Sequence, residues 1–433
     1  MKSLKLFAFL LIFGSFLTSC IEDECTTERE VFVYNPIYKT KEELKERKVE
    51  VLTSRDIINP GKVFYIGTTL LVSETGQGVH VIDNSDKENP TPIAYLKIPG
   101  NVDVSYHDGH LIADSYQDIL LIDISDVLDP TVTGTIGDVG SNRYHYDEQK
   151  DAYIVGYNQE PVTQTLPCND PFFERDYGYY YRNDYSILSN AEVSFDASGF
   201  TPKSGGSIGG QAPGIAGSNS SFAIVGDHFY FIEYDKVQVY NINDKSLPIF
   251  NDEFRVAWNI ETLFPYGDHL FIGGQEGMYI YDNTDPADPE YISEFVHARA
   301  CDPVVVQGNT AYVTLSEGTS CRNFTNQLDV IDITNISNPT LIKSYELYKP
   351  KGLSIHDDLL VVCDEKAGLK IFDATDKSAI DDNKLSAYQG YTFIEVIYIE
   401  ARVIMAIGPD GIFQLDISDP ETPVLLSRIE TGV

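Results

Sequence analysis

Residues 119–123 read Ile119-Leu120-Leu121-Ile122-Asp123, an apolar run that ends on an acidic residue and precedes a polar turn. The same pattern recurs with its acidic or amide residue at Asp83, Asp123, Asp196, Asn241, Asp282, Asp332, Asp373 and Asp416, and the copy at Asp196 is the weakest. Neighbouring copies are 40 to 50 residues apart, except for one interval of 73. Short apolar runs bounded by polar turns are typical of β-strands. The chain is therefore built from a repeated unit of strands.

Each repeat also contains a hairpin of two apolar runs around a tight turn, such as the turn His107-Asp108-Gly109. The hairpins fall at residues 63–72, 102–114, 144–157, 222–234, 260–272, 303–315, 352–363 and 394–407. A repeat of about 40 residues that holds only strands is typical of a β-propeller. Both counts favour eight, so we predict an all-β propeller of eight four-stranded blades. Seven blades is the alternative, in which the Asp196 copy belongs to an insertion.

The motif at the end of the third strand resembles the LVIVD repeat family, most closely at Leu121-Ile122-Asp123-Ile124-Ser125-Asp126 and at Leu415-Asp416-Ile417-Ser418-Asp419-Pro420. The resemblance implies a β-propeller among surface or periplasmic lipoproteins, and it brings no catalytic residue with it. We expect the repeated aspartate to accept hydrogen bonds from backbone N–H groups of the following turn. A calcium site at Asp282, Asp285 and Asp288 is the alternative, but their spacing differs from that of a calcium loop.

The N-terminal residues predict export. Two lysines precede an apolar run, Leu6–Leu17, which has the length of a signal-peptide core and is too short for a resident membrane helix. The next residues, Leu17-Thr18-Ser19-Cys20, resemble the lipobox of bacterial lipoproteins, which implies cleavage before Cys20 and lipid on that cysteine. The acidic stretch Ile21–Glu24 resembles a signal for the outer leaflet, with a solvated linker as the alternative. We predict an outer-membrane lipoprotein that faces the cell surface or, otherwise, the periplasm.

Three segments follow from these features. Residues 1–19 are predicted as the signal peptide, residues 20–49 as a lipidated tether and lead-in segment, and residues 50–433 as one propeller domain. The propeller carries an aromatic-rich insertion at about 158–190. Either Lys48–Leu52 or the last strand, Pro423–Ile429, is expected to close the ring.

The chain is strongly acidic, with 31 Lys+Arg against 66 Asp+Glu. Removing Lys2 and Lys5 with the signal peptide leaves 29 against 66, a net charge of −37. Such a charge repels phosphate backbones and anionic lipid headgroups, so we expect no nucleic-acid partner and a membrane contact only through the lipid on Cys20. The glycine-rich run Ser204–Gly210 lacks the lysine and helix of a phosphate-binding loop, and no cofactor is expected.

The strand order predicts where a ligand would bind. Loops between second and third strands, and loops from an outer strand to the next inner strand, emerge on one face around the channel mouth. Candidate ligand contacts on that face are Tyr177, Tyr179, Tyr180, Tyr181 and Trp258. Aromatic rings suit a glycan or a protein ligand. The alternatives are a loop that packs its rings on itself, and a Trp258 ring packed between blades.

The remaining reactive side chains give weaker signals. Cys301 and Cys321 are predicted to form a disulfide on the same face, and Cys363 to be a buried thiol. Five histidines, His107, His110, His228, His269 and His356, fall at hairpin turns, where a turn role is preferred to a ligand role. No Cys-His spacing resembles a metal site. The sequence has no catalytic motif, and only isolated acids approach the channel mouth: Asp103, Glu261, Asp302 and Glu395.

Three classes of function stay open. The leading class is a non-catalytic binding or scaffold propeller, favoured by the absence of a catalytic motif. The second is a propeller enzyme, such as a glycoside-cleaving hydrolase or a lyase, whose carboxylates meet only in space. The third is an architectural subunit of an envelope complex. A ring of acids with a basic residue at the channel mouth would favour the enzyme, and an aromatic platform would favour binding.

Overall fold

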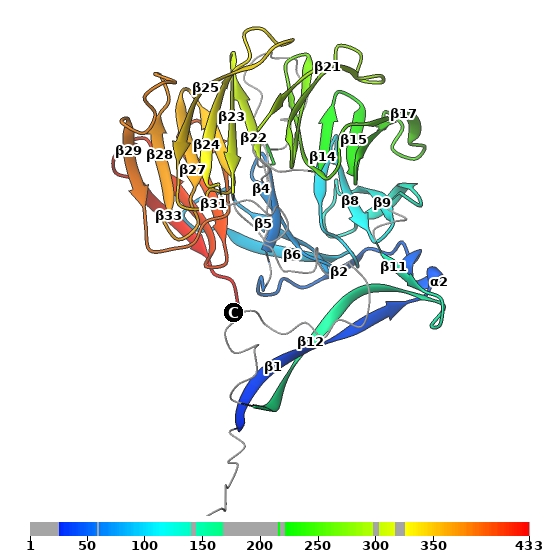
Figure 1. Cartoon of the computed structure of the whole chain (residues 1–433). Helices are drawn as coiled ribbons and strands as arrows, with labels where there is room; N and C mark the ends of the chain where they lie inside the picture. Colours follow the sequence, from blue (N-terminus) through cyan, green and yellow to red (C-terminus); the bar gives the residue numbers. More distant parts are fainter. Residues whose placement is uncertain are drawn as a thin grey trace, which may run out of the picture. The chain divides into compact units, whose positions relative to one another are not determined.

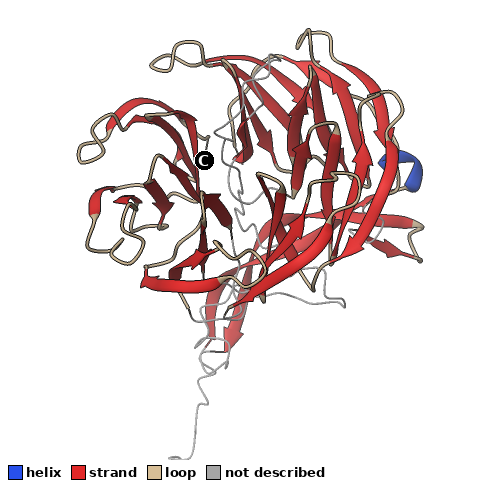
Figure 2. Cartoon of the chain, turned by 90° about the horizontal axis from the view of Figure 1, so that it is seen from above, coloured by secondary structure: helices blue, strands red, loops and turns tan. Residues whose placement is uncertain are grey.

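A computed structural model describes residues 26–58, 60–139, 144–167, 215–216, 221–297, 303–316 and 325–432. Strands form nearly all of its regular structure, and the one helix in these ranges is α2 (Lys41–Leu44), which begins with a capping box between Thr40 and Glu43 (Figure 2). None of the described helical structure is long and apolar enough to cross a bilayer. The chain divides into two compact units, residues 39–155 with 186–433 and residues 1–38 with 156–185.

The larger unit contains seven sheets in which four consecutive strands pair antiparallel, numbered here as blades 1 to 7 in chain order (Figure 1). The inner strands are β3 (Pro60–Ile66), β7 (Val104–His107), β14 (Phe222–Val225), β18 (Ile260–Tyr266), β22 (Val304–Gln307), β26 (Leu353–His356) and β30 (Glu395–Glu400). The second strands are β4 (Thr69–Glu74), β8 (His110–Ser115), β15 (His228–Glu233), β19 (His269–Gly274), β23 (Thr310–Leu315), β27 (Leu359–Cys363) and β31 (Val403–Gly408).

The third and fourth strands complete each blade. The third strands are β5 (Gly78–Asp83), β9 (Asp118–Asp123), β16 (Lys236–Asn241), β20 (Gly277–Asp282), β24 (Gln327–Asp332), β28 (Leu369–Asp373) and β32 (Gly411–Asp416). The outer strands are β6 (Thr91–Lys97), β10 (Thr131–Ile136), β17 (Ile249–Arg255), β21 (Glu290–Val296), β25 (Thr340–Glu346), β29 (Lys384–Tyr388) and β33 (Val424–Ile429). Blade 1 has two further strands, with β2 (Glu50–Leu52) on its outer edge and β13 (Ile215–Ala216) on its inner edge.

The continuous apolar runs of the second strands follow from burial on both faces. In β8, Leu111 and Ala113 pack against blade 1, whereas Ile112 between them packs against blade 3. Successive side chains of a strand point to opposite faces, so a strand between two neighbouring blades needs apolar residues at every position. The repeated apolar runs therefore specify sheets that pack face to face, rather than a single sheet with one solvent-exposed face.

Apolar clusters fill all seven seams between neighbouring blades, which shows that the ring is closed. Blades 2 and 3 are direct neighbours, because Ile112 and Leu121 pack with Phe229 and Phe231. Gly134 in β10 supports the same contact, since a Cβ there would lie 1.9 Å from the carbonyl oxygen of Lys245 in blade 3. No further blade separates these two.

Blade 7 closes directly on blade 1. The side-chain amides of Asn84 and Gln414 exchange two buried hydrogen bonds, of 2.9 and 2.7 Å, across this seam. The hydroxyl of Ser427 donates to the carbonyl of Lys87 at 2.6 Å. The last strand, β33, completes blade 7, and the segment at 48–52 supplies β2 as an extra outer strand of blade 1. Both expected strands thus exist, and each belongs to a different blade.

The structure corrects the predicted number of blades. The described residues form eight antiparallel sheets, as many as the repeats, but the hairpin expected as the third blade lies outside the ring. Its strands are β11 (His145–Asp147) and β12 (Ala152–Pro167), which form a three-stranded sheet with β1 (Thr26–Lys39) in the order β1-β12-β11. The propeller therefore has seven blades, the alternative stated above, and Asp196 lies outside the described residues.

The physical reason for this correction lies in burial. The second strands of the blades are apolar and buried at consecutive positions, whereas the 144–157 hairpin is partly exposed, with Tyr146 42% exposed. A hairpin pattern alone does not say whether a hairpin enters a ring. The strand β1 was also missed, because its charged start reads as part of a tether.

A β-bulge in every outer strand supports the count of seven. The ladder between third and outer strands skips one residue in each blade, namely Ile93, Thr133, Asn251, Ile292, Ile342, Leu385 or Leu426. Bulges twist an exposed edge and hinder pairing with another chain. The bulge is thus part of the repeat, and in the six blades whose outer strand forms the sheet edge it hinders pairing with another chain.

The repeated acidic residue has the turn role predicted for it. In each blade its side-chain oxygen accepts the backbone N–H of the residue two positions later, over 2.7 to 3.0 Å. Blade 3 uses the amide of Asn241 in place of a carboxylate. In the other six blades, hydrogen bonds from the side chain and backbone N–H of that later residue lower the aspartate pKa below its ordinary value.

These lowered pKa values predict a loss of stability in acid. A carboxylate whose pKa is lower in the folded chain stabilises the fold above its ordinary pKa of about 4, and this contribution is lost as the pH falls through the folded pKa. We expect the thermal midpoint to fall as the pH drops below about 4. Replacing the six aspartates by asparagine, as in blade 3, keeps the acceptor and should make that fall shallower. Equal pH profiles for the two proteins would contradict this explanation.

Candidate binding face

One exposed aromatic pair lies on the loop face of the propeller. This is the face on which loops from second to third strands and from outer to inner strands emerge. Trp258 lies in the loop from β17 to β18, and Tyr234 lies in the loop from β15 to β16, so both belong to the face predicted to bind. Their ring centroids are 5.1 Å apart and their planes meet at 85°. Trp258 is 65% exposed and Tyr234 is 55% exposed. The Trp258 ring is therefore not packed between blades, which was the alternative.

The backbone fixes this aromatic pair. The N–H of Val256 donates to the carbonyl of Asp235 at 2.9 Å, and the N–H of Ile260 donates to the carbonyl of Tyr234 at 3.3 Å. Val256 also packs against the apolar core shared by blades 3 and 4. Tyr234 has a positive φ of 66°, a left-handed backbone conformation that is uncommon for residues other than glycine. The two rings are thus presented by a rigid base.

Polar groups surround the pair at close range. Arg255 and Asp235 form an ion pair of 3.0 Å, and the Asn259 side-chain amide donates to the Glu261 carboxylate at 3.1 Å. Planar aromatic faces with amide, carboxylate and guanidinium groups beside them can stack on one part of a ligand and hydrogen-bond another. This arrangement is suited to binding, and it needs no proton transfer.

The predicted acids near the channel mouth include one that is paired with a base, and this pair has a structural role. Asp103 is 2% exposed, and four donors surround its carboxylate. Lys62 donates at 2.8 Å, the Ser221 hydroxyl and N–H at 2.5 and 3.1 Å, and the N–H of Val104 at 2.8 Å. Lys62 lies in the inner strand of blade 1, and Asp103 and Ser221 directly precede the inner strands of blades 2 and 3. The carboxylate therefore ties three blades together.

The other acids near the mouth also have structural neighbours. Glu395 is 2% exposed and accepts the N–H of Val396 at 3.1 Å. Gly352 of blade 6 lies so close to it that a Cβ there would be 2.8 Å from a Glu395 carboxylate oxygen. Glu261 accepts from Asn259, as described above, and Asp302 lies outside the described residues.

A buried ionisable cluster in blade 1 was missed from sequence. Glu74 is fully buried and accepts hydrogen bonds from Arg55 and from His80, the latter at 3.0 Å. Burial raises the pKa of Glu74, but the bonds from His80 and Arg55 outweigh burial and the pKa is lowered. Arg55 also lies 4.0 Å from the centre of the Tyr95 ring, and burial raises the pKa of Tyr95 to about 12. Through Arg55, the cluster holds the connection between β2 and β3 against blade 1.

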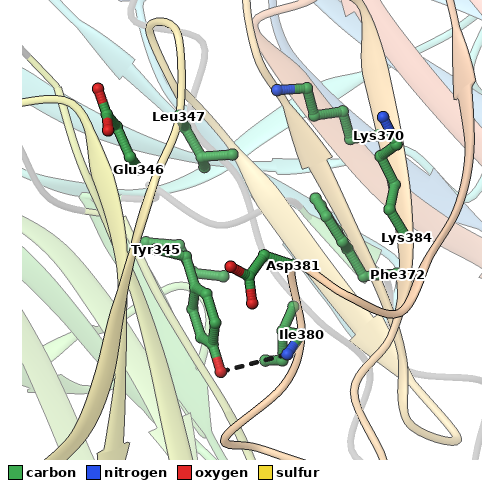
Figure 3. Close-up of a pocket in the computed structure, with 9 residues that line it drawn as sticks. Tyr345, Glu346, Leu347, Lys370, Phe372, Ile380, Asp381 and Lys384 are labelled. Atoms are coloured by element: carbon green, nitrogen blue, oxygen red, sulfur yellow. Dashed lines mark hydrogen bonds between the residues drawn. The ribbon is translucent and has the colours of Figure 1, made fainter.

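A cavity of about 160 Å³ lies between blades 5 and 6 (Figure 3). It is lined by Leu328, Tyr345, Glu346, Leu347, Lys370, Phe372, Ile380, Asp381 and Lys384. Tyr345 bridges the two blades there, because its hydroxyl donates to the Lys377 carbonyl at 2.7 Å and accepts the Ile380 N–H at 3.2 Å. Pockets that hold drug-sized ligands measure about 300 Å³ or more. We therefore assign this cavity to the packing of the blades.

Several predicted site residues lie outside the described residues. These are the lipidation site Cys20, the tyrosines Tyr177, Tyr179, Tyr180 and Tyr181, and both cysteines of the predicted disulfide, Cys301 and Cys321. They stay predictions. Cys363 is a free, fully buried thiol, as expected, and burial raises its pKa.

Comparisons with known proteins agree with this fold. The family model of the LVIVD repeat matches residues 298–346, which contain β22 to β25 of blade 5. The crystal structure of Saccharomyces cerevisiae Sqt1 matches with a TM-score of 0.51 and 8% identity, over 92% of this chain and 89% of Sqt1. Kluyveromyces lactis Hsv2 matches with a TM-score of 0.47 and 9% identity, over 86% of this chain and 100% of Hsv2. No curated protein matches the sequence. At such identities the likeness concerns the fold alone.

Proposed function

We propose that this β-propeller, which carries the LVIVD repeat, is an exported lipoprotein whose loop face binds a glycan or a peptide without changing it chemically. One observation carries the proposal: Trp258 and Tyr234 form an exposed, rigidly held aromatic pair on the loop face. Loops on a rigid scaffold are where propellers and other repeat folds carry specificity. The proposed ligand contacts are these two rings, together with the predicted contacts Tyr177, Tyr179, Tyr180 and Tyr181.

The ligand class follows from the chemistry of the pair. An exposed indole ring offers a flat apolar face to a sugar ring or to a peptide side chain, at a small cost in side-chain entropy. Asn259 and Glu261 lie beside Trp258 and supply an amide and a carboxylate for ligand hydroxyl or N–H groups. With a net charge of −35, the chain favours a neutral or basic ligand over a polyanion.

An enzymatic role has less support. General acid–base catalysis needs a titratable group within reach of a substrate proton. The carboxylate of Asp103 is buried and surrounded by four donors, and its partner Lys62 is held in the same ion pair. Both groups hold blades together, so binding is the better supported function.

An array experiment tests this proposal. The chain from Cys20 onward, produced without lipid, would be applied to glycan and peptide arrays. We expect saturable binding to a related set of glycans or of peptides, and intact ligand on recovery from the array. Release of a cleaved product would replace the binding role by an enzymatic one. Absence of any saturable ligand on both arrays would count against a binding role.

The anchoring part of the proposal rests on the signal-peptide pattern and the lipobox. Cys20→Ser removes the thiol that would carry the lipid, so the lipid anchor is lost. We expect complete loss of labelling by a radioactive or alkyne-tagged fatty acid and a shift of the protein out of the membrane fraction. Cys363→Ser is the matched control, because that thiol is buried inside blade 6. Membrane partitioning that survives Cys20→Ser would contradict the lipid anchor.

A further inference from the structure

We propose that His107, Asp108 and Asp227 bind a divalent first-row metal ion such as Zn²⁺ across the seam between blades 2 and 3. His107 ends β7 and Asp108 follows it in the hairpin turn of blade 2, whereas Asp227 lies in the corresponding turn of blade 3. Hairpin turns between inner and second strands lie on the face opposite the loop face. This site is therefore separate from the proposed ligand-binding face, and it does not depend on that proposal.

The three ligand atoms already have the spacing of a metal site. The His107 Nε2 atom lies 3.1 Å from an Asp227 carboxylate oxygen and 3.5 Å from an Asp108 carboxylate oxygen. All three ligand atoms lie within 4.8 Å of one another. Zinc binds imidazole nitrogen and carboxylate oxygen at about 2.0–2.1 Å, so neighbouring ligands in a tetrahedral site are about 3.3 Å apart. A metal ion could enter with small side-chain rotations and without moving either turn.

The local charge also favours a cation. Among the described residues, the only ion-pair partner of Asp108 and of Asp227 is His107, and neither carboxylate has a lysine or arginine. With a neutral imidazole, two negative charges face each other across the seam. A divalent cation would neutralise both, and it has a path from solvent because Asp108 is exposed and Asp227 is partly exposed.

The ligand set identifies the class of metal. Imidazole nitrogen suits zinc and its first-row neighbours, whereas calcium and magnesium prefer sites built from oxygen alone. Three protein ligands leave at least one position for water. Since the ligands come from two blades, a bound ion would tie the blades together on this face.

Blade 6 offers a natural control for this site. Its hairpin turn repeats the pair as His356 and Asp357, with 3.5 Å between the imidazole nitrogen and the carboxylate. In the part of the chain that the structure describes, that pair belongs to no group of three metal ligands. His356→Ala therefore removes an equivalent histidine without touching the proposed site.

Titration calorimetry with Zn²⁺ alone tests the proposal, using the chain from Cys20 onward. We expect a saturable site in the wild type and in His356→Ala, and about 100-fold weaker binding or none in His107→Ala, because loss of a direct ligand should exceed the 10- to 100-fold effect of outer-shell partners. Zinc should also raise the thermal midpoint of the wild type and of His356→Ala, but not that of His107→Ala.

A second variant keeps the test decisive if His107→Ala folds poorly. Asp227→Asn is nearly isosteric at an exposed turn and should weaken Zn²⁺ binding while leaving the fold intact. Calcium should give no saturable binding that these substitutions change. Absence of a saturable zinc site in the wild type would overturn the proposal. Equal zinc affinities for the wild type, His107→Ala and Asp227→Asn would also overturn it, because the zinc would then bind elsewhere.

Discussion

Asp103→Ala is expected to destabilise the propeller by about 3–5 kcal/mol, because it removes one partner of a buried ion pair. Lys62 has only 11% of its side chain exposed, and it would lose its 2.8 Å ion pair with Asp103. The N–H and hydroxyl of Ser221 would lose their acceptor in the same step. Because these groups come from blades 1, 2 and 3, the substitution removes contacts that join three blades. Equilibrium unfolding in urea, followed by circular dichroism, measures the change.

The control for this prediction is a solvent-exposed ion pair on the protein surface. Glu50 pairs with Lys48 and Lys97 at the edge of blade 1, where all three side chains are well exposed. Exposed pairs contribute little to stability, so Glu50→Ala should leave the urea midpoint nearly unchanged. Equal shifts of the midpoint in Asp103→Ala and Glu50→Ala would contradict the stabilising role of the buried contacts of Asp103.

Trp258→Ala is expected to weaken ligand binding by at least about 2 kcal/mol, or roughly 30-fold, which is the effect of removing an aromatic hot spot. The ring is exposed, so the substitution should leave the unfolding midpoint unchanged. Tyr291→Ala is the matched control, because Tyr291 is 56% exposed but lies in the outer strand β21 rather than in the loop face. Equal affinity of Trp258→Ala and Tyr291→Ala for the ligand would move the site away from this pair.

The strands and their repeat could be predicted because both depend on local sequence. Apolar runs such as Leu111–Ala113 need burial on both faces, and the turn after each third strand needs the side-chain acceptor with which that strand ends. Whether a hairpin joins the ring depends instead on the neighbours it meets. The 144–157 hairpin has the local pattern of the others, yet the packing of blade 2 on blade 3 leaves it outside the ring. No local pattern contains that information.

The candidate site was predictable in part for the same reason. Trp258 could be placed on the loop face, since the strand order fixes the face of each loop. Its partner Tyr234 was missed because it occupies an ordinary short turn, and its contact with Trp258 joins two different loops. Asp103 was identified as an acid near the channel mouth. Its bonds to Lys62 and Ser221 cross two seams, and residue spacing along the chain does not encode such contacts.

The most direct test of a binding loop face uses the fact that Trp258 is the only tryptophan in the chain. Its fluorescence therefore reports on this site alone, and its 65% exposure makes it accessible to a soluble quencher such as acrylamide. Titration with a ligand identified on the arrays should shift the emission to shorter wavelength and protect Trp258 from acrylamide, with a midpoint equal to the Kd from calorimetry. Saturable binding in calorimetry with unchanged emission and unchanged quenching would contradict the account, because the ligand would then bind away from Trp258.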